Sequence, residues 1–135
     1  MDLFKRKVIL DTNFLLIPGQ FKVNVFAEIE RVMDVPYHLC IIDKTVDELK
    51  KVIVFGNTKD RQAAKLGLAL VNDLLKQKSL KRITSSSSES VDDAIVYNSS
   101  KKVYVATVDK ELKRRVKEKG GSIITLKQKK YLVRE

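Results

Sequence analysis

The chain has 135 residues, of which 44% are apolar and 33% are charged. That length fits one domain with a hydrophobic core of its own, so we treat residues 1–135 as a single unit. No apolar run approaches the roughly 20 residues that a membrane-spanning helix needs. The basic start MDLFKRKVIL is not followed by the long apolar segment of a signal peptide. We therefore expect no association with membranes.

The single cysteine and single histidine limit the chemistry further. One cysteine cannot form an internal disulfide, and a reducing cytoplasm is the simplest setting for such a chain. A zinc site built from nitrogen and sulfur ligands is excluded, because it would need several of these residues. Any metal ion must therefore be held by oxygen atoms.

The net charge of +10 is concentrated near the C-terminus. Residues 101–135 contain twelve Lys or Arg against four Asp or Glu, whereas residues 1–100 contain fifteen against thirteen. A basic face of this kind is the footprint expected for a polyanion such as nucleic acid. A lysine-rich surface that supplies only solubility is the competing interpretation.

Strand-like and helix-like segments alternate along the chain. The pattern predicts, in order, a strand at 7–10, a helix at 23–33, a strand at 39–42, a helix capped by Asp43 and ending at Val54, and a helix capped by Thr58 and ending at Gln77. A weak strand at 82–84, a helix at 91–100, a strand at 103–107, a helix at 110–119 and a strand at 122–126 follow. Residues 127–135 are either a basic tail or an edge strand. The alternation predicts an α/β fold, a three-layer sandwich around a mostly parallel sheet.

Acidic residues stand where these strands end or the following helices begin: Asp11, Glu48, Asp92 with Asp93, and Asp109. Each has an ordinary explanation, because a lone acid at such a place is usually a turn former, a helix cap or a solvated side chain. Ser90 and Asp93, for example, are spaced as a capping box. If the first and fourth strands are neighbours in the sheet, however, these acids meet at one edge. Carboxylates that converge in this way need a cation.

The segments ILDTNFLL, TVDEL, VDDAIV and VATVDKELKRRVKEKG, in that order, resemble the PIN domain, a family of small metal-dependent ribonucleases. The resemblance covers nearly the whole chain. It is greatest to the archaeal relatives of the small-subunit-processome PIN nuclease of eukaryotes, and weaker to the VapC toxins. The resemblance implies that the catalytic and metal-binding residues are Asp11, Glu48, Asp92 or Asp93, and Asp109. It implies supporting roles for Asn13, which would orient Asp11, for Thr107, and for Glu111 as an outer acid.

The expected function is that of an endoribonuclease that uses one or two Mg²⁺ or Mn²⁺ ions, with RNA, in particular a ribosomal RNA precursor, as its partner. A VapC-like toxin ribonuclease and a non-catalytic RNA-binding assembly factor are the alternatives, and a homodimer is compatible with either. The helical spacing of Lys110, Lys113, Arg114 and Lys117 places a row of cations beside Asp109, where they could hold phosphates. Aromatic residues make up only 7% of the chain, so we do not expect base stacking to dominate recognition.

Two other classes with acidic sites fit the sequence less well. A receiver domain normally has two acids at the end of its first strand, where this chain has only Asp11. A phosphatase of the haloacid dehalogenase type needs a DxD motif, and position 13 is Asn.

Overall fold

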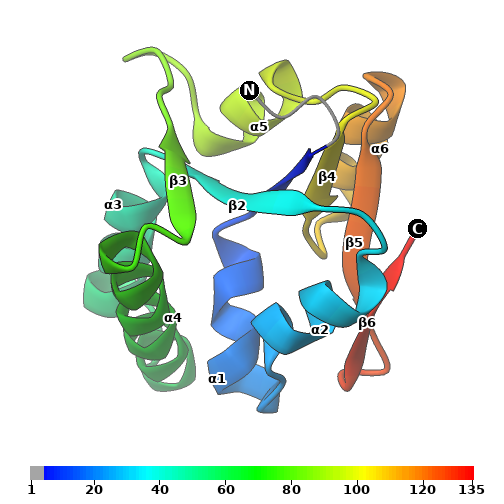
Figure 1. Ribbon diagram of the computed structural model, residues 1–135. Helices are drawn as coiled ribbons and strands as arrows, with labels where there is room; N and C mark the ends of the chain where they lie inside the picture. Colours follow the sequence, from blue (N-terminus) through cyan, green and yellow to red (C-terminus); the bar gives the residue numbers. More distant parts are fainter. Residues whose placement is uncertain (1–4) are drawn as a thin grey trace.

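A computed structural model describes residues 5–135 and shows one six-stranded sheet flanked by helices (Figure 1). The strands are β1 (Arg6–Leu10), β2 (Tyr37–Ile42), β3 (Leu80–Ile83), β4 (Val103–Ala106), β5 (Ser122–Lys127) and β6 (Tyr131–Arg134). The helices are the 3₁₀ helix η1 (Asn13–Leu16) and the α-helices α1 (Ile17–Phe21), α2 (Val25–Val32), α3 (Thr45–Phe55), α4 (Thr58–Lys76), α5 (Val91–Tyr97) and α6 (Lys110–Glu118). The sheet order is β3-β2-β1-β4-β5-β6, and every pair is parallel except β5 with β6.

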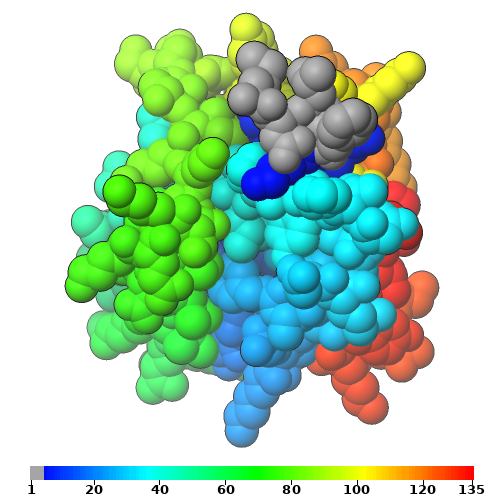
Figure 2. Space-filling view, viewed as in Figure 1, coloured from blue at the N-terminus to red at the C-terminus, as the bar shows by residue number. Residues whose placement is uncertain are grey.

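The two faces of the sheet bury separate hydrophobic cores. Successive side chains of a strand point to opposite faces, so Val8 and Leu10 pack with the side of α1 to α4, while Ile9 packs with the side of α5 and α6. Figure 2 shows the first of these sides filled by side chains, with the α2 segment between the α4 segment and the C-terminal segment. The predicted three-layer α/β/α sandwich with a mostly parallel sheet is confirmed. Within residues 5–135, no helix combines the length and apolarity that crossing a membrane requires.

The first and fourth strands are neighbours, and this arrangement positions the site. β1 pairs with β2 on one side and with β4 on the other. The chain first runs from β1 outward through β2 to β3, then crosses back through α5 to β4 on the other side of β1. A crevice opens at the carboxyl ends of β1 and β4, where the direction of strand addition reverses. Open α/β sheets bind ligands at such a switch point.

Two short helices, η1 and α1, occupy a stretch for which the sequence pattern predicted no element. The apolar side chains Phe14, Leu15, Leu16 and Ile17 are all buried there, and an unbroken apolar run shows neither helical nor strand periodicity. α4 packs closely on this stretch because Gly67 has no side chain; a Cβ atom at that position would lie 2.4 Å from the carbonyl oxygen of Leu15.

Two of the predicted helix caps are wrong. Lys44, not Asp43, stands at the N-cap of α3, and the Asp43 carboxylate instead accepts hydrogen bonds from the backbone and hydroxyl of Ser85. Asn57, not Thr58, caps α4 by accepting from the backbone NH of Asp60. Local sequence cannot distinguish adjacent polar residues as caps, because the choice depends on where the chain turns.

Other boundaries differ by a few residues. β3 begins two residues earlier than predicted, at Leu80, because its pairing with β2 starts opposite Leu39. α5 ends at Tyr97 instead of residue 100, and the side chain of Asn98 there donates to the carbonyl of Ala94.

The C-terminal segment contributes the last strand of the sheet. Leu132 of β6 is fully buried. Its backbone NH donates to the Glu28 carboxylate of α2 (2.9 Å), and its carbonyl accepts from Arg31 (2.7 Å). These bonds occupy the outward backbone groups of Leu132 in the middle of β6, which would otherwise be open for pairing.

Candidate active site

Asp11 lies directly after β1, with only 4% of its surface exposed. The hydroxyl of Thr107, which directly follows β4, donates to Asp11 Oδ2 at 2.8 Å. The pKa of Asp11 is raised from 3.8 to about 6, first by burial and also by the negative charges of Asp92 and Asp109, against the lowering effect of the Thr107 hydrogen bond. A carboxylate whose pKa is raised by burial and by neighbouring charges is a candidate for a functional site.

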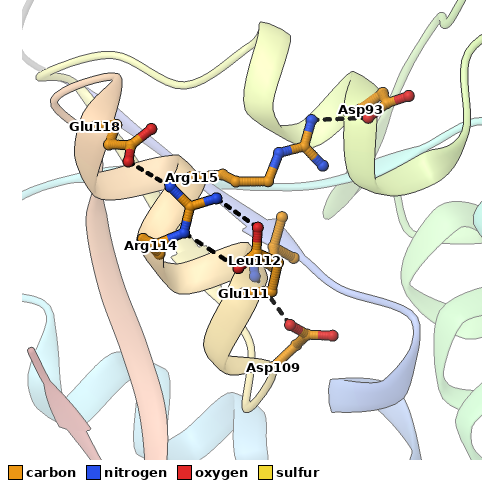
Figure 3. A network of polar contacts seen from close by, with 7 residues as sticks. All are labelled: Asp93, Asp109, Glu111, Leu112, Arg114, Arg115 and Glu118. Atoms are coloured by element: carbon orange, nitrogen blue, oxygen red, sulfur yellow. Dashed lines mark hydrogen bonds and ion pairs between the residues drawn. The ribbon is translucent and has the colours of Figure 1, made fainter.

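Thr107 also fixes the next acid. Its hydroxyl oxygen accepts from the backbone NH of Asp109 at 3.1 Å while donating to Asp11. Asp109 Oδ1 accepts from the backbone NH of Leu112 at 2.9 Å and so caps α6 (Figure 3). One oxygen of Asp109 is therefore engaged as a cap, while the residue still lines the pocket described below.

Glu48 reaches the same place from the first turn of α3. Its Oε1 atom accepts from the hydroxyl of Thr12 at 2.5 Å, across 36 positions of sequence. Thr12 is itself buried, so this contact ties α3 to the end of β1. Asn13, which the family resemblance would have orient Asp11, is exposed and makes no hydrogen bond to that carboxylate within residues 5–135.

The structure separates the two adjacent aspartates of α5. Asp92 lines the pocket, and its pKa is raised by partial burial and by the charges of Asp109 and Glu48. Asp93 points toward α6, where Oδ1 accepts from Arg115 at 2.8 Å, and this bond lowers its pKa (Figure 3). The backbone NH of Asp93 donates to Ser90, so the capping interaction predicted for this turn exists. The sequence left both aspartates as candidates; only Asp92 faces the other acids.

Together these residues line a pocket of about 390 Å³ at the carboxyl ends of β1 and β4: Asp11, Thr12, Asn13, Glu48, Lys51, Val52, Ser90, Val91, Asp92 and Asp109. Within residues 5–135, none of its four carboxylates is in an ion pair. A larger hollow of about 690 Å³ lies at the amino ends of β2 and β3. That is the edge opposite to the one where ligands of parallel sheets bind.

The carboxylates surround the pocket without closing on a single point. Among the described residues, no three Asp, Glu, His or Cys side chains are placed so that they would enclose an ion directly. Mg²⁺ does not require such a cage, because it usually keeps several waters and binds proteins through one or two carboxylates. The all-oxygen donor set and the shared negative charge therefore fit a hydrated divalent cation.

Residues outside the pocket depart from the sequence expectations. Glu111, expected as an outer acid, does not line the pocket: its carboxylate binds Arg114 at 2.5 Å on the exposed side of α6, which lowers its pKa (Figure 3). Arg114 also pairs with Glu118. Lys113 and Lys117 lie 3.3 and 3.7 Å from the Glu135 carboxylate. Of the four predicted phosphate-binding cations, only Lys110 has no ion pair within residues 5–135.

Five pocket residues were not among the sequence candidates, and two of these, Thr12 and Lys51, affect the chemistry of the site through a hydroxyl group and a positive charge. Thr12 lies between Asp11 and Asn13, and its position beside an acid was the only available signal. Lys51 follows Glu48 by one helical turn, which places it on the same side of α3.

The fold and the pocket define a class of protein: a doubly wound α/β domain with an acidic site at the carboxyl edge of its sheet. The chain belongs to the PIN-like domain family, whose model matches residues 8–129. The resemblance to PIN-domain ribonucleases inferred from the sequence is confirmed.

Individual relatives agree with this assignment. Ribonuclease VapC4 from Methanocaldococcus jannaschii is 29% identical to the chain over 126 residues, and the match covers 93% of both sequences. The structure of the PIN domain endonuclease Utp24 superposes with a TM-score of 0.72 at 26% identity, covering 96% of this chain and 90% of that one. A domain of a functionally unknown protein from M. jannaschii, at 17% identity and a TM-score of 0.58, covers 90% of this chain and 91% of its own and shares the fold.

The buried charge of Asp11 predicts a stability gain from its removal. Because the native pKa of Asp11 is raised, folding favours its protonated form and disfavours its ionised form. The stabilising contribution of protonated Asp11 is therefore complete below pH 3.8 and is lost as the pH rises through about 6. In metal-free protein at pH 8, we expect Asp11→Asn to raise the free energy of unfolding by about 1–3 kcal/mol.

Urea denaturation with EDTA present, at pH 8 and at pH 4.5, measures this gain. It should shrink at the lower pH, where native Asp11 is neutral. Asp93→Asn serves as the control, because that carboxylate is exposed and paired. A variant that is no more stable than wild type at pH 8 would contradict the burial argument.

Proposed function

We propose that this protein is an endoribonuclease that hydrolyses RNA phosphodiester bonds with the help of Mg²⁺ or Mn²⁺. The observation that supports the proposal most is the convergence of four carboxylates, from four separate parts of the chain, on one pocket in which none forms an ion pair with any residue of 5–135. Membership of the PIN-like family and the ribonuclease and endonuclease names of two relatives point to the same activity.

The residues that would hold the cation are Asp11, Glu48, Asp92 and Asp109. When bound, one or two such ions would supply Lewis acidity, lowering the pKa of a water nucleophile and neutralising the charge of the leaving oxygen. The chain's own groups keep the acids in place. Thr107 orients Asp11 and the backbone of Asp109, and Thr12 orients Glu48.

Negative charge in the pocket also explains why the surrounding surface must be basic. A phosphodiester is repelled by four carboxylates unless cations compensate for them. Lys51 lines the pocket, Lys110 begins the helix capped by Asp109, and the chain has a net charge of +10. Such a field steers a polyanion toward the site.

Within this activity we propose ribosomal RNA processing in the cytoplasm, which follows the resemblance of the paired aspartates and the ATVDKELKRR segment to the ribosome-biogenesis branch. The structural likeness to the endonuclease Utp24 supports it. A toxin-type ribonuclease is the second candidate, because the relative named VapC4 covers nearly the whole chain.

Cleavage of a structured RNA under single-turnover conditions tests the activity. We expect cleavage with Mn²⁺ or Mg²⁺, none with EDTA, and recovery when the metal is restored. Asp11→Asn should abolish cleavage without loss of folding. A protein that binds the RNA tightly but leaves it uncut with either metal would instead be a non-catalytic assembly factor.

Substitution of the adjacent aspartates separates the ligand from its neighbour. We expect Asp92→Asn to lower the single-turnover rate roughly 100-fold or more, because even residues behind a metal ligand cost 10–100-fold when changed. Asp93→Asn removes an exposed ion pair with Arg115, which is worth about 1 kcal/mol of stability at most. Its cleavage rate should stay near that of wild type. Equal losses in the two variants would contradict the assignment.

The pairing of the basic residues on α6 predicts unequal effects on RNA binding. Lys110→Gln should reduce the slope of log K against log salt concentration by about 0.7, the value for one phosphate contact on a single strand. Lys113→Gln should change it less, because the Lys113 side chain is only 17% exposed and its ammonium group already pairs with Glu135. Fluorescence anisotropy with Asp11→Asn protein, from 50 to 300 mM salt, compares the two; a larger effect at Lys113 would reverse our ranking.

A further inference from the structure

One exposed aromatic side chain lies on the helix that supplies Glu48. Phe55, the last residue of α3, is 82% exposed, more than any other large apolar side chain within residues 5–135, and the adjacent Val54 is 64% exposed. A single exposed apolar residue is ordinary on a protein surface. Phe55 differs from an ordinary exposed residue because it lies on the side of α3 that lines the acidic pocket.

Phe55 continues the row of α3 residues that lines the pocket. Residues three, four and seven positions apart share one side of a helix, so Glu48, Lys51, Val52 and Phe55 form a single stripe. The first three line the pocket. At 1.5 Å per residue, Phe55 lies about 10 Å beyond Glu48 along the helix axis. The stripe therefore runs from the carboxylates, past one lysine, to an exposed aromatic ring.

Cations predominate around Phe55, with the acid Asp60 among them in the first turn of α4. The α3–α4 turn follows it directly, and the Arg61 side chain of α4 bonds back to the carbonyl of Ile53 at 2.9 Å, which holds the guanidinium against this end of α3. Arg61 and Lys65 line a small hollow on the same stretch of α4. Lys50, Lys51 and Lys59 are also exposed on these two helices. A second copy of this chain would bring like charge to the surface, whereas a polyanion would be attracted.

We propose that Phe55 and Lys51 form a subsite for an unpaired nucleotide of the RNA, in which the base stacks on the Phe55 ring and the adjoining phosphate contacts Lys51. The inference rests on the proposed ribonuclease function and adds to it a position outside the acidic pocket, at the end of α3, where one base of the RNA is held. Stacking of bases on exposed aromatic rings, with cations along the backbone, is the general means of holding unpaired strands. A base inside a duplex has no free face to offer to the ring.

Binding of two RNAs to the full chain, made uncleavable by Asp11→Asn, tests the subsite. The probes are a fluorescein-labelled unstructured RNA of ten nucleotides and a blunt RNA duplex of the same length. We expect Phe55→Leu, which keeps the apolar bulk but removes the π face, to weaken single-strand binding about tenfold. Duplex binding should be unchanged, and Phe55→Trp should bind the single strand at least as well as the parent protein.

Tyr97→Leu is the matched control, because Tyr97 is 76% exposed but, five residues after Asp92 on α5, does not share the side of the helix on which Asp92 lines the pocket. It should leave both affinities unchanged. The subsite is refuted if Phe55→Leu binds the single strand as tightly as the parent, or if it weakens single strand and duplex equally. It is also refuted if sedimentation velocity shows a dimer that Phe55→Leu dissociates, because Phe55 would then belong to a contact between copies.

Cleavage by the chain with Asp11 intact separates failure of the subsite from failure of the proposed function. With Mn²⁺, Phe55→Leu should raise KM for single-stranded RNA about tenfold and leave kcat unchanged, since the ring does not touch the reacting atoms. If Phe55→Leu cleaved RNA with the KM of the wild type, the subsite proposal would be refuted and the proposed ribonuclease function would stand. Absence of cleavage by the wild-type chain under all metal conditions would remove the function itself, and the subsite proposal with it.

Discussion

The rest of the site depends on a carboxylate buried where two neighbouring parallel strands end. Asp11 is almost inaccessible to solvent, and the Thr107 hydroxyl, at 2.8 Å, offsets only part of the cost of its charge. The same hydroxyl accepts from the backbone of Asp109, so one threonine links the end of β1 to the start of α6. Asp11 and Asp109, which belong to different elements, are thereby held close enough to repel each other. The pocket that they line is therefore suited to a positively charged ligand.

Helix starts are the second organising feature. α3, α5 and α6 all begin at the edge of the sheet where Asp11 lies, and each has an acid in or just before its first turn. The positive end of a helix dipole lowers the cost of such a negative charge. Each helix also has a different structural reason for its acid: a cap at Asp109, a bond from Thr12 at Glu48, and a position beside the Ser90 cap at Asp92. A site of like charges is therefore assembled from locally stable parts.

Much of this arrangement follows from the sequence, because strand-end acids in a parallel sheet must share one edge once the strand order is known. The alternation of elements predicted the sheet, and the family resemblance implied that the acids belong to one metal-binding site. The choice between Asp92 and Asp93 was beyond prediction, since it depends on Arg115, 22 residues away. The hydrogen bond from Thr12 to Glu48 likewise joins residues 36 positions apart. Arg114, expected to bind phosphate, instead forms ion pairs with its helix neighbours Glu111 and Glu118. These outcomes are set by tertiary packing and by competition between local ion pairs, neither of which has a signature in spacing alone.

The short strand β3 has a consequence for how copies of this protein behave in concentrated solution. It is an edge strand of the sheet, and the unpaired backbone groups of an edge strand can pair with a strand of another chain and so start aggregation. β3 has only four residues, and two of them, Lys81 and Arg82, are exposed cations. A second β3 approaching this margin would bring its own cations against them, and the strand is too short to compensate with many backbone hydrogen bonds. At the opposite margin, α2 already occupies backbone groups of β6. The sheet thus resists open-ended polymerisation at both sides while its acidic crevice stays accessible.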